Sequence, residues 1–496
     1  MKSQLGLSIR FLRAPSRCPL LEIGLRLVIS SMLVGLVFRT AGADELAQRE
    51  SAAPQTGEGR DLHVHQTKGD DSRDGVVGPV QTIARAIRLA KPGDTIHLTP
   101  GTWYESADLT NKHGELDKPI TLDGHGAILD GCEPIVAAEW EELGDGLFRK
   151  TKLMKRMDDA ILGRWFFLWD GKMNLMGRTS KGPSEPLKEP AILQDNEWTY
   201  VKAEDAFYIR LPKDQTLVDA NIRYPARSSA VIQSVSGSHL VVRNITGTHV
   251  YNDGFNIHGS QRNMVFKNIA AIECGDDGFS AHEDAECRIT GFTSIGNSTG
   301  LCDTVSSVTH YKNVFIKDCH GYDIYFIGDS PHSMENVLVE SSAARPVTIA
   351  RHTDRPQNGP GTATLKNVHI RRVVPTPGEV RVSMGAKLNL EGCTLLGINV
   401  MVTPGGEVNL QRTVLAGDRK PDVLLFPNTI WLGSHNFYDL GSLRVAQTGF
   451  RSKTFPDFQR LLGTEKESVW VSEPDHNPPA DLGASEPALR RLLRRE

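Results

Sequence analysis

The sequence predicts an all-β solenoid, on the evidence of a repeated pattern and of its strand-like spacing. Between Ser238 and Leu410 a short pattern returns every twenty-odd residues, with a polar residue, most often Asn, at its sixth position. The first five copies carry this residue at Asn244, Asn268, Gly291, Asn313 and Asn336, in steps of 24, 23, 22 and 23 residues. A period of this length is typical of stacked repeats, in which no single unit can bury its own apolar face.

The spacing inside each copy is that of a strand. Apolar residues alternate, as in Leu240 and Val242 or Met264 and Phe266, which is the two-residue period of β-structure. The recurring Asn marks one bend of each coil. A leucine-rich repeat has a similar length but needs an LxxLxL frame, which is absent. Later copies continue at Asn367, Gly392 and Arg412, the first of them after a longer loop.

Residues 1–43 have the features of a signal peptide. Basic residues precede an apolar run from Leu27 to Phe38, and Ala41-Gly42-Ala43 fits cleavage before Asp44. The run is shorter than the ~20 residues of a membrane span. We therefore expect a secreted or periplasmic protein, cleaved after Ala43 and without stable membrane insertion. Residues 44–60 are polar and are expected to form a disordered linker.

The charge of the chain disfavours one class of partner. Residues 1–43 hold six of the 56 Lys and Arg and one of the 60 Asp and Glu, so the rest carries a net charge of −9. A general nucleic-acid binder would be basic. We expect no nucleic-acid partner, and we expect the protein to act as a monomer.

Both ends of the solenoid have candidate caps. Ile83, Ala86, Ile87 and Ala90 share one face, which predicts a short amphipathic helix over Thr82 to Ala90. A helix laid across the first coil would cover a strand edge that could otherwise pair with other chains. Residues 61–133 are therefore expected to form this cap and the first coils. Within 451–496 we expect a final helix from Phe455 to Leu462, followed by a Pro-rich and then basic tail.

The N-terminal region carries a family resemblance. The frame GDD..DG...P..TI..AI..A.PGDTI.L.PGTW.E, followed by KPITLDGHGAILDG, resembles the N-terminal cap of pectate-lyase-like right-handed parallel β-helix proteins. The resemblance covers roughly residues 61–131 and 229–420, which is most of the chain after residue 60, and residues 227–450 are expected to form the parallel β-helix. It implies a right-handed parallel β-helix, in a superfamily many of whose members cut or modify acidic polysaccharides. One fold hosts several chemistries, so the reaction has to be argued from the site.

Residues 134–226 interrupt the repeat and are aromatic and basic. Segments such as RWFFLWDGK from Arg164 and FYIRLP from Phe207 predict two or three β-hairpins folded against the solenoid. Aromatic faces beside cations suit sugar binding. The alternative is that Trp165 to Trp169 form the small core of this insertion. Arg227, at its end, is a candidate substrate-binding residue.

The candidate site is a motif that occurs twice, one coil apart. YNDGFNIHG from Tyr251 and GDDGFSAHE from Gly275 align at a spacing of 24 residues. Adjacent coils stack at ~4.8 Å, so Asp253 should lie beside Asp277, and His258 beside His282. The inward parity of Phe255 and Phe279 places Asn256 and both histidines on the outer face. Carboxylates held this close raise at least one pKa or recruit a cation.

The paired motif locally resembles that of polygalacturonases, in which an Asp is followed one coil later by Asp-Asp. The resemblance implies that Asp253, Asp276 and Asp277 are the acid/base carboxylates. Two departures stand against it. The next coil reads Ser298-Thr299-Gly300 in place of Gly-His-Gly, and the following coil reads YDIYFIGD from Tyr322 in place of Arg-Ile-Lys.

We favour lyase or epimerase chemistry at the carbon next to a uronic-acid carboxylate. Such an enzyme neutralises the carboxylate and removes the neighbouring proton with a base. Calcium ligated by Asp276, Asp277, Glu283 and Asp284 could neutralise it. By the register no Lys faces this site, which leaves His258, His282 or Tyr251 as the base.

Substrate is expected to contact Arg227, Asn256, Arg345 and Arg351. Two alternatives to lyase or epimerase chemistry stay open, a polygalacturonase-like hydrolase and a non-catalytic carbohydrate-binding or envelope solenoid. If the site is catalytic, Asp277 is expected to be exposed and replaceable at little cost in stability. His282 is then expected to set the pH dependence near neutrality.

Overall fold

The computed structural model describes residues 59–352, 359, 361–471, 478–479 and 482–494. The predicted signal peptide and nearly all of the predicted linker lie outside these residues. No helix in the part of the chain that is described is both long and apolar enough to cross a bilayer.

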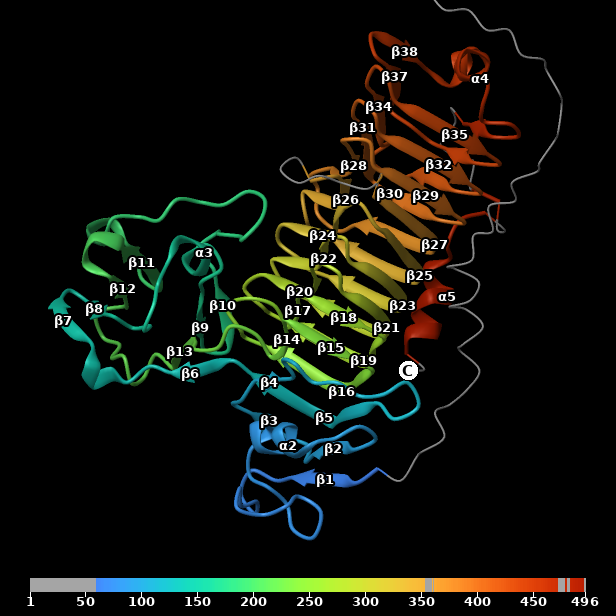
Figure 1. Cartoon of the computed structure of the whole chain (residues 1–496). Helices are drawn as coiled ribbons and strands as arrows, with labels where there is room; N and C mark the ends of the chain where they lie inside the picture. Colours follow the sequence, from blue (N-terminus) through green and yellow to red (C-terminus); the bar gives the residue numbers. More distant parts are fainter. Residues whose placement is uncertain (1–58, 353–358, 360, 472–477, 480–481, 495–496) are drawn as a thin grey trace, which may run out of the picture. The chain divides into compact units, whose positions relative to one another are not determined.

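One side of the coils forms a 12-stranded sheet (Figure 1), in which all neighbours are parallel except the last pair, β37 and β38. In spatial order its strands are β4 (Ala107–Asp108), β14 (Val231–Gln233), β17 (Phe255–Ile257), β20 (Asp277–Ala281), β22 (Thr299–Val305), β24 (Tyr322–Gly328), β26 (Arg345–Ala350), β28 (Gly378–Val382), β31 (Ile398–Val402), β34 (Asp422–Leu425), β37 (Ser442–Val445) and β38 (Thr448–Phe450).

The rest of each coil belongs to a 17-stranded parallel sheet, whose long strands turn through the recurring bend. Its strands are β1 (Asp61–Val64), β2 (Thr95–Leu98), β3 (Thr102–Trp103), β5 (Ile120–Asp130), β16 (Leu240–Thr248), β19 (Met264–Ile272), β21 (Glu286–Ile295), β23 (Val308–Lys317), β25 (Pro331–Ser341), β27 (Thr362–Arg372), β29 (Lys387–Glu391), β30 (Thr394–Leu396), β32 (Glu407–Gln411), β33 (Val414–Ala416), β35 (Ile430–Ser434), β36 (Phe437–Tyr438) and β39 (Val469–Trp470). A two-stranded sheet pairs β15 (Ser236–Ser238) with β18 (Ser260–Arg262). The predicted right-handed parallel β-helix is confirmed.

The predicted stack of bend residues is also confirmed. Asn244, Asn268, Asn313 and Asn336 all have φ between 49° and 58°, the left-handed conformation that Asn tolerates better than most residues. The side chains form a ladder, since Asn336 Nδ2 donates to Asn313 Oδ1 at 3.1 Å and Asn367 Nδ2 donates to Asn336 Oδ1 at 2.8 Å. The bend thus fixes the register from one coil to the next.

Aromatic side chains fill the interior beside the candidate site. Phe279 packs on Phe255 in the coil before, with ring centroids 6.1 Å apart, and edge-on against Phe266 at 5.0 Å. All three are fully buried. This ladder confirms the inward parity from which the outer face was predicted.

Helices cover the ends and one side of the coils. Helix α2 (Ile83–Leu89) is N-capped by Thr82 and buries Ile83, Ala86 and Ile87, as predicted. At the other end α4 (Phe455–Leu462) buries two Phe side chains against the last coils. Helix α5 (Glu486–Leu493), in the segment expected as a tail, lies beside the coils (Figure 1). Its Leu489 packs with Leu338 of β25.

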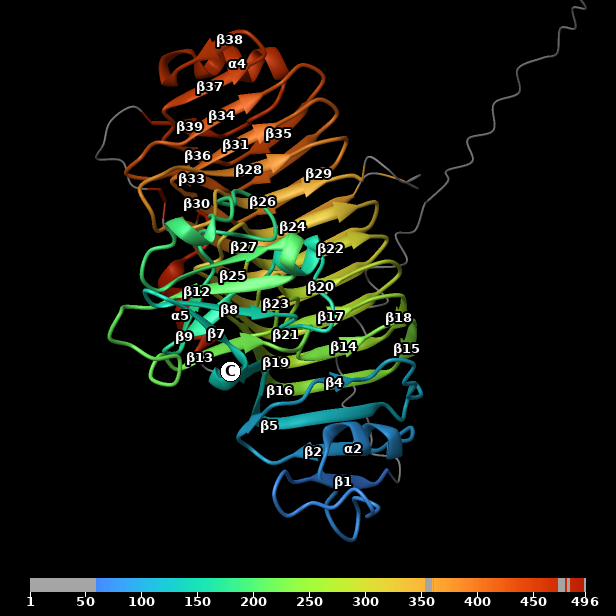
Figure 2. The ribbon, with the colours of Figure 1, turned by 90° about the vertical axis from the view of Figure 1, so that its left-hand side faces the viewer.

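The insertion forms two four-stranded antiparallel sheets and the short helix α3 (Asp159–Leu162), and it faces the viewer in Figure 2. One sheet contains β10 (Lys172–Asn174), β9 (Phe167–Trp169), β13 (Ile222–Pro225) and β6 (Cys132–Pro134); the other contains β11 (Glu197–Val201), β12 (Ala206–Arg210), β8 (Leu147–Thr151) and β7 (Glu141–Gly144). Trp165, Phe166, Phe167 and Trp169 are all buried. These four side chains form the insertion's own core. They therefore do not form a sugar-binding surface, and the alternative that they are core residues is correct.

Replacing Asn336 should separate the two contributions of the bend residue. Asn336→Gly loses the amide ladder but keeps a residue suited to positive φ, whereas Asn336→Ala loses the ladder and strains the backbone by about 1 kcal/mol more. We expect both variants to melt below the wild type, with the Ala variant lower. Thermal unfolding followed by circular dichroism measures this order. Equal melting temperatures for the two variants would contradict it.

Candidate active site

The duplicated motif brings three carboxyl groups together. Phe255 pairs with Phe279 in the sheet register, and the backbone N–H of Asp277 donates to Asp253 Oδ1 at 3.1 Å. Oxygens of Asp253, Asp276 and Asp277 all lie within 4.8 Å of one another. The predicted stacking of these residues is present in the structure.

These carboxyl groups are buried, which the sequence analysis did not anticipate. Asp253, Asp276 and Asp277 are only 3%, 2% and 2% exposed. The insertion lies over them and excludes solvent. The expectation that Asp277 is exposed is therefore wrong, and the argument from exposure that its replacement costs little stability no longer applies.

Two cations from the insertion neutralise the cluster. Lys181 Nζ lies 2.5 Å from Asp276 Oδ1 and 2.7 Å from Asp277 Oδ1. Arg164 Nε lies 2.7 Å from Asp276 Oδ2, and the Ser180 hydroxyl donates to Asp276 Oδ1. The prediction that no Lys faces the site is wrong, because it considered only side chains of the coils themselves.

Two glycines of the coils give the insertion room to approach. A Cβ atom on Gly275 would lie 2.2 Å from the carbonyl oxygen of Arg164, and one on Gly321 would lie 2.2 Å from that of Lys181. Ser298 accepts a hydrogen bond from the Ser180 N–H at 3.0 Å. These small residues were the available sequence signal for a segment packed on the coils.

The site separates the pKa values of its carboxyl groups. Burial raises the pKa of Asp253 to about 6, and the nearby Asp276 charge adds to the effect. Burial and Asp276 likewise raise the pKa of Asp277 well above its usual value. Burial opposes ionisation of Asp276 too, but Lys181 and Arg164 outweigh it and hold its pKa below the usual value. Three carboxyl groups beside two cations are balanced when one carboxyl keeps its proton.

Lys181 stays positively charged in this setting. Burial alone would lower its pKa, but Asp277 and Asp276 raise the pKa well above the usual value. A lysine that holds its proton so firmly is suited to binding an anion and unsuited to removing a proton.

The two motif histidines stack outside the coils, with ring centroids 4.1 Å apart. His258 Nδ1 lies 3.1 Å from Glu283 Oε2, and His282 Nδ1 lies 3.0 Å from Thr304 Oγ1. Burial, with His258 and Lys181 adding to it, lowers the pKa of His282 to about 3. This lowered pKa argues against His282 as the group that sets a pH dependence near neutrality.

The four residues expected to ligate calcium do not form one site. Glu283 binds His258 and the N–H of Gly259, and Asp284 is exposed beside Ser260. Asp276 and Asp277 hold the Lys181 ammonium group, which takes the place of a metal cation. This donor set does not fit Ca²⁺ as arranged.

The expected substrate contacts are spread over the surface. Arg227 pairs with Glu133 at 2.8 Å, and half-buried Tyr251 packs on Trp165. Asn256 lies beside Ser280 in the register, and its buried Oδ1 has no hydrogen-bond partner. Arg351 is half-buried at the edge of the undescribed residues 353–358.

Tyr322, Tyr325 and Arg345 form what we call the tyrosine strip, which begins two coils beyond the cluster. Thr299, Tyr322 and Arg345 continue the Asp277 column in the next three coils. The two Tyr rings lie 4.5 Å apart, and Arg345 Nη1 donates to the Tyr322 hydroxyl at 3.2 Å. Three rungs separate Asp277 from Arg345, which is about 14 Å.

A cavity of about 830 Å³ is lined mainly by residues of the insertion, among them Trp169 and Arg178. Thr179 and Pro183, which flank the segment that contacts the carboxyl groups, also line it, but the three carboxyl groups do not.

Searches with protein-family models and against curated proteins find no match. Among solved structures the chain is similar to XylC in complex with xylose, with a TM-score of 0.54 and 11% identity, over 84% of this chain and 86% of that one. A glycoside hydrolase gives a TM-score of 0.42 at 11% identity, over 86% and 99% of the two chains. Pectate lyase Pel9A gives a TM-score of 0.36 at 12% identity, over 76% of this chain and 79% of that one. The first of these supports a shared fold and nothing more.

Asp253→Asn should remove a pH dependence of stability. Because the pKa of Asp253 is raised to about 6 in the folded state, the folded protein binds this proton more tightly than the unfolded chain does. Its stabilising contribution is then fully present near pH 4 and is lost as the pH rises through about 6, by up to about 3 kcal/mol. The variant cannot ionise at this position and should lose less stability over that interval.

Melting temperatures between about pH 4 and pH 8 measure this difference. Asp284→Asn, at an exposed carboxylate, is the control and should follow the wild type. Parallel curves for Asp253→Asn and the wild type would show that Asp253 does not hold the proton.

Proposed function

We propose that this protein is a carbohydrate-active enzyme that cleaves a polysaccharide by acid–base catalysis at Asp253, Asp276 and Asp277. The observation that carries the proposal is the division among these carboxyl groups. The pKa of Asp276 is held below its usual value by Lys181 and Arg164, while burial and the Asp276 charge raise the pKa of both Asp253 and Asp277. Titratable neighbours whose pKa values are pushed apart are how enzymes assign an acid and a base.

Hydrolysis of a glycosidic bond uses such a pair. Asp253 or Asp277 would protonate the leaving oxygen, and ionised Asp276 would act as the nucleophile or as the base that activates water. The objection that this chain lacks the cations of polygalacturonases is weakened, because the insertion supplies Arg164 and Lys181. Substrate access requires the Ser180–Lys181 segment to move off the carboxyl groups, as active-site loops of many enzymes do.

The half-buried Tyr325 and Arg345 of the tyrosine strip support a polymeric substrate, whereas Tyr322 is buried beside them. Aromatic faces stack on sugar rings, and Arg345 has a hydroxyl but no carboxylate among its hydrogen-bond partners in the described chain. Such an arginine suits the carboxylate of an acidic sugar. The fold is also that of a protein solved with bound xylose.

Lyase or epimerase chemistry on a uronic-acid polymer is the second candidate. The observation in its favour is the pair of insertion cations, which could neutralise a substrate carboxylate once they leave Asp276. The pKa of Lys181 makes it a poor base, so Asp253 or Asp277 would have to remove the proton. We further infer from the N-terminal sequence that the enzyme is exported.

Asp276→Asn should abolish turnover, with a loss of at least ~10²-fold. The test is a panel of neutral and uronic-acid polysaccharides, followed by new reducing ends, by absorbance of new C=C bonds and by exchange with solvent protons. Reducing ends without unsaturation identify a hydrolase, unsaturation a lyase, and exchange alone an epimerase. Asp284→Asn is the matched control and should retain activity. If the wild type shows no activity in any of the three assays, the protein is a carbohydrate-binding protein rather than an enzyme. If the Asp276→Asn variant is active, the catalytic site lies elsewhere.

The pH profile should follow the aspartates. If Asp253 is the acid, kcat/KM should fall as the pH rises above about 6, because the proton that it donates is then lost. His282→Gln should leave this fall in place, since His282 is already neutral at that pH. Loss of the pH dependence in His282→Gln would contradict the assignment. Activity that needs a divalent ion, and that a chelator removes, would restore the calcium hypothesis.

A further inference from the structure

The bend of one early coil differs from all the bends that stack on it. Strand β5 pairs Asp123 with Arg243 and Ala127 with Ile245, so residues 124–126 stand opposite Asn244 alone. This bulge carries His125 at φ 50° and Gly126 at φ 87°. His125 therefore projects from the coil, with its side chain 45% exposed.

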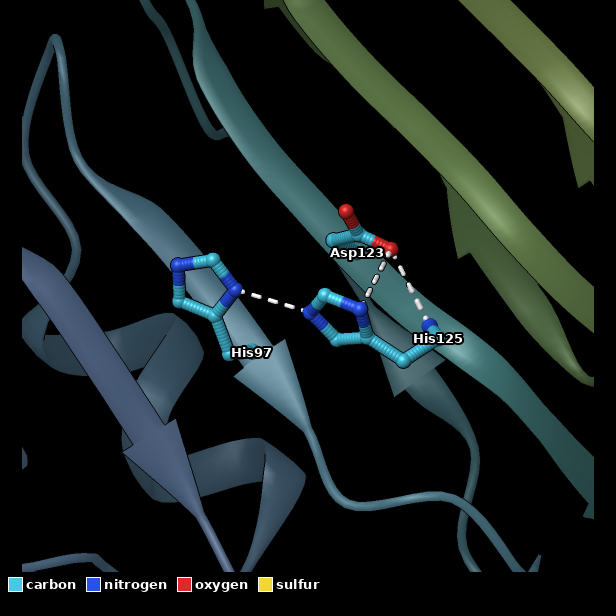
Figure 3. A group of neighbouring side chains, drawn as sticks. All are labelled: His97, Asp123 and His125. Carbon is cyan, nitrogen blue, oxygen red and sulfur yellow. Dashed lines mark hydrogen bonds and ion pairs between the residues drawn. The ribbon is translucent and has the colours of Figure 1, made fainter.

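A second histidine faces this bulge from the coil before. The register places His63, His97 and Asp123 in one column, outside the core that buries Leu62, Ile96 and Leu122. Figure 3 shows the rings of His97 and His125 directed at each other, with His97 Nδ1 2.9 Å from His125 Nε2. They come from adjacent rungs, β2 and β5.

A carboxylate lies near the far nitrogen of each ring. Asp61 Oδ1 lies at hydrogen-bond distance, 2.9 Å, from His97 Nε2. Asp123 Oδ1 lies 3.8 Å from His125 Nδ1, beyond hydrogen-bond distance, and accepts the backbone N–H of His125 at 3.0 Å. A carboxylate that accepts the N–H of one ring nitrogen leaves the other nitrogen as a lone-pair donor. Carboxylate–histidine–metal arrangements in proteins have this form, with the carboxylate fixing the tautomer and the ring.

We propose that His97 Nδ1 and His125 Nε2 form a zinc-binding site, in which Asp61 orients the His97 ring and Asp123 holds the backbone of His125. The ion would take the place of the direct contact between the two ring nitrogens. Zn–N distances of about 2.0–2.1 Å in a tetrahedral site require the nitrogens to be about 3.4 Å apart. The rings must therefore open by about 0.5 Å, which an exposed histidine between Gly124 and Gly126 can do. Imidazole pairs of this kind also accept Ni²⁺ and Cu²⁺.

Asp123 is already engaged and acts mainly as a support. Its Oδ2 accepts from Arg243 Nε at 2.7 Å, and its Oδ1 accepts from Asn244 Nδ2 at 2.9 Å. With at most a weak bond from Asp123, the ion keeps open positions for water or a ligand. His125 and Gly126 also line a cavity of about 640 Å³ that Arg490 borders. The open positions thus adjoin a space of ligand size, away from the three catalytic carboxyl groups.

The test is a titration of the full chain with Zn²⁺, followed by calorimetry, and with Co²⁺, followed by its visible absorption. We expect one Zn²⁺ per chain and a Co²⁺ spectrum typical of low coordination number. His97→Gln and His125→Asn should each weaken Zn²⁺ binding at least about tenfold, and Asp61→Ala about tenfold through the loss of ring orientation. Zn²⁺ should also raise the melting temperature of the wild type, because it binds only the folded state.

The matched control is His435→Asn. His435 is also exposed and also has a left-handed backbone, with φ 56°, and Asn tolerates this conformation at both positions. Its affinity for Zn²⁺ should equal that of the wild type.

A second comparison uses His258→Gln, which removes the other pair of stacked histidines. Binding lost in this variant and kept in His125→Asn would overturn the proposal. Absence of wild-type binding at millimolar Zn²⁺, which would leave only a hydrogen-bonded histidine pair, would overturn it as well.

Discussion

The rest of this structure depends on the exact stacking of one coil on the next. Parallel strands at ~4.8 Å spacing place each side chain beside its counterpart in the neighbouring coil, and the left-handed Asn bend holds that alignment. Asparagine serves here for two reasons, because it accepts positive φ and because its amide can bond to the next amide. Any motif that occurs in two successive coils is therefore converted into a pair of touching groups.

That constraint creates an electrostatic problem at the candidate site. Asp253 and Asp277 are stacked by the register, Asp276 lies beside them, and all three are removed from water. Buried like charges are unstable unless cations or protons balance them. The neighbouring column positions hold Thr299 and Tyr322, which carry no positive charge. The insertion solves the problem from outside the repeat, through Arg164 and Lys181, and the remaining imbalance is the proton on which the proposed chemistry depends.

The contrast between the repeating coils and the non-repeating insertion explains what could be predicted from the sequence. The repeat length, the alternation of inward and outward side chains and the position of the Asn bend all follow from local spacing. The solenoid, the α2 cap and the contact of Asp253 with Asp277 could therefore be predicted. The cations could not, because Lys181 reaches Asp276 across 95 residues from a segment with no period. Burial of the carboxyl groups and the low pKa of His282 were missed for the same reason. They depend on how a non-repeating segment packs, and only small residues such as Gly275 and Gly321 indicated that packing in advance.

The chemistry of this protein therefore lies where its repetition is broken. A regular coil offers the same column of side chains to its neighbours, and a column of identical groups cannot provide both an acid and its counter-charge. At the aspartate cluster the insertion supplies the groups that the regular column lacks. At the proposed zinc site two extra residues in one bend do so, because they turn His125 back toward His97 of the preceding rung. In both places the register fixes one set of groups rigidly, and the irregular segment brings a complementary group to it. A rigid partner and a movable one are what a site needs if it is to bind and release a ligand or an ion.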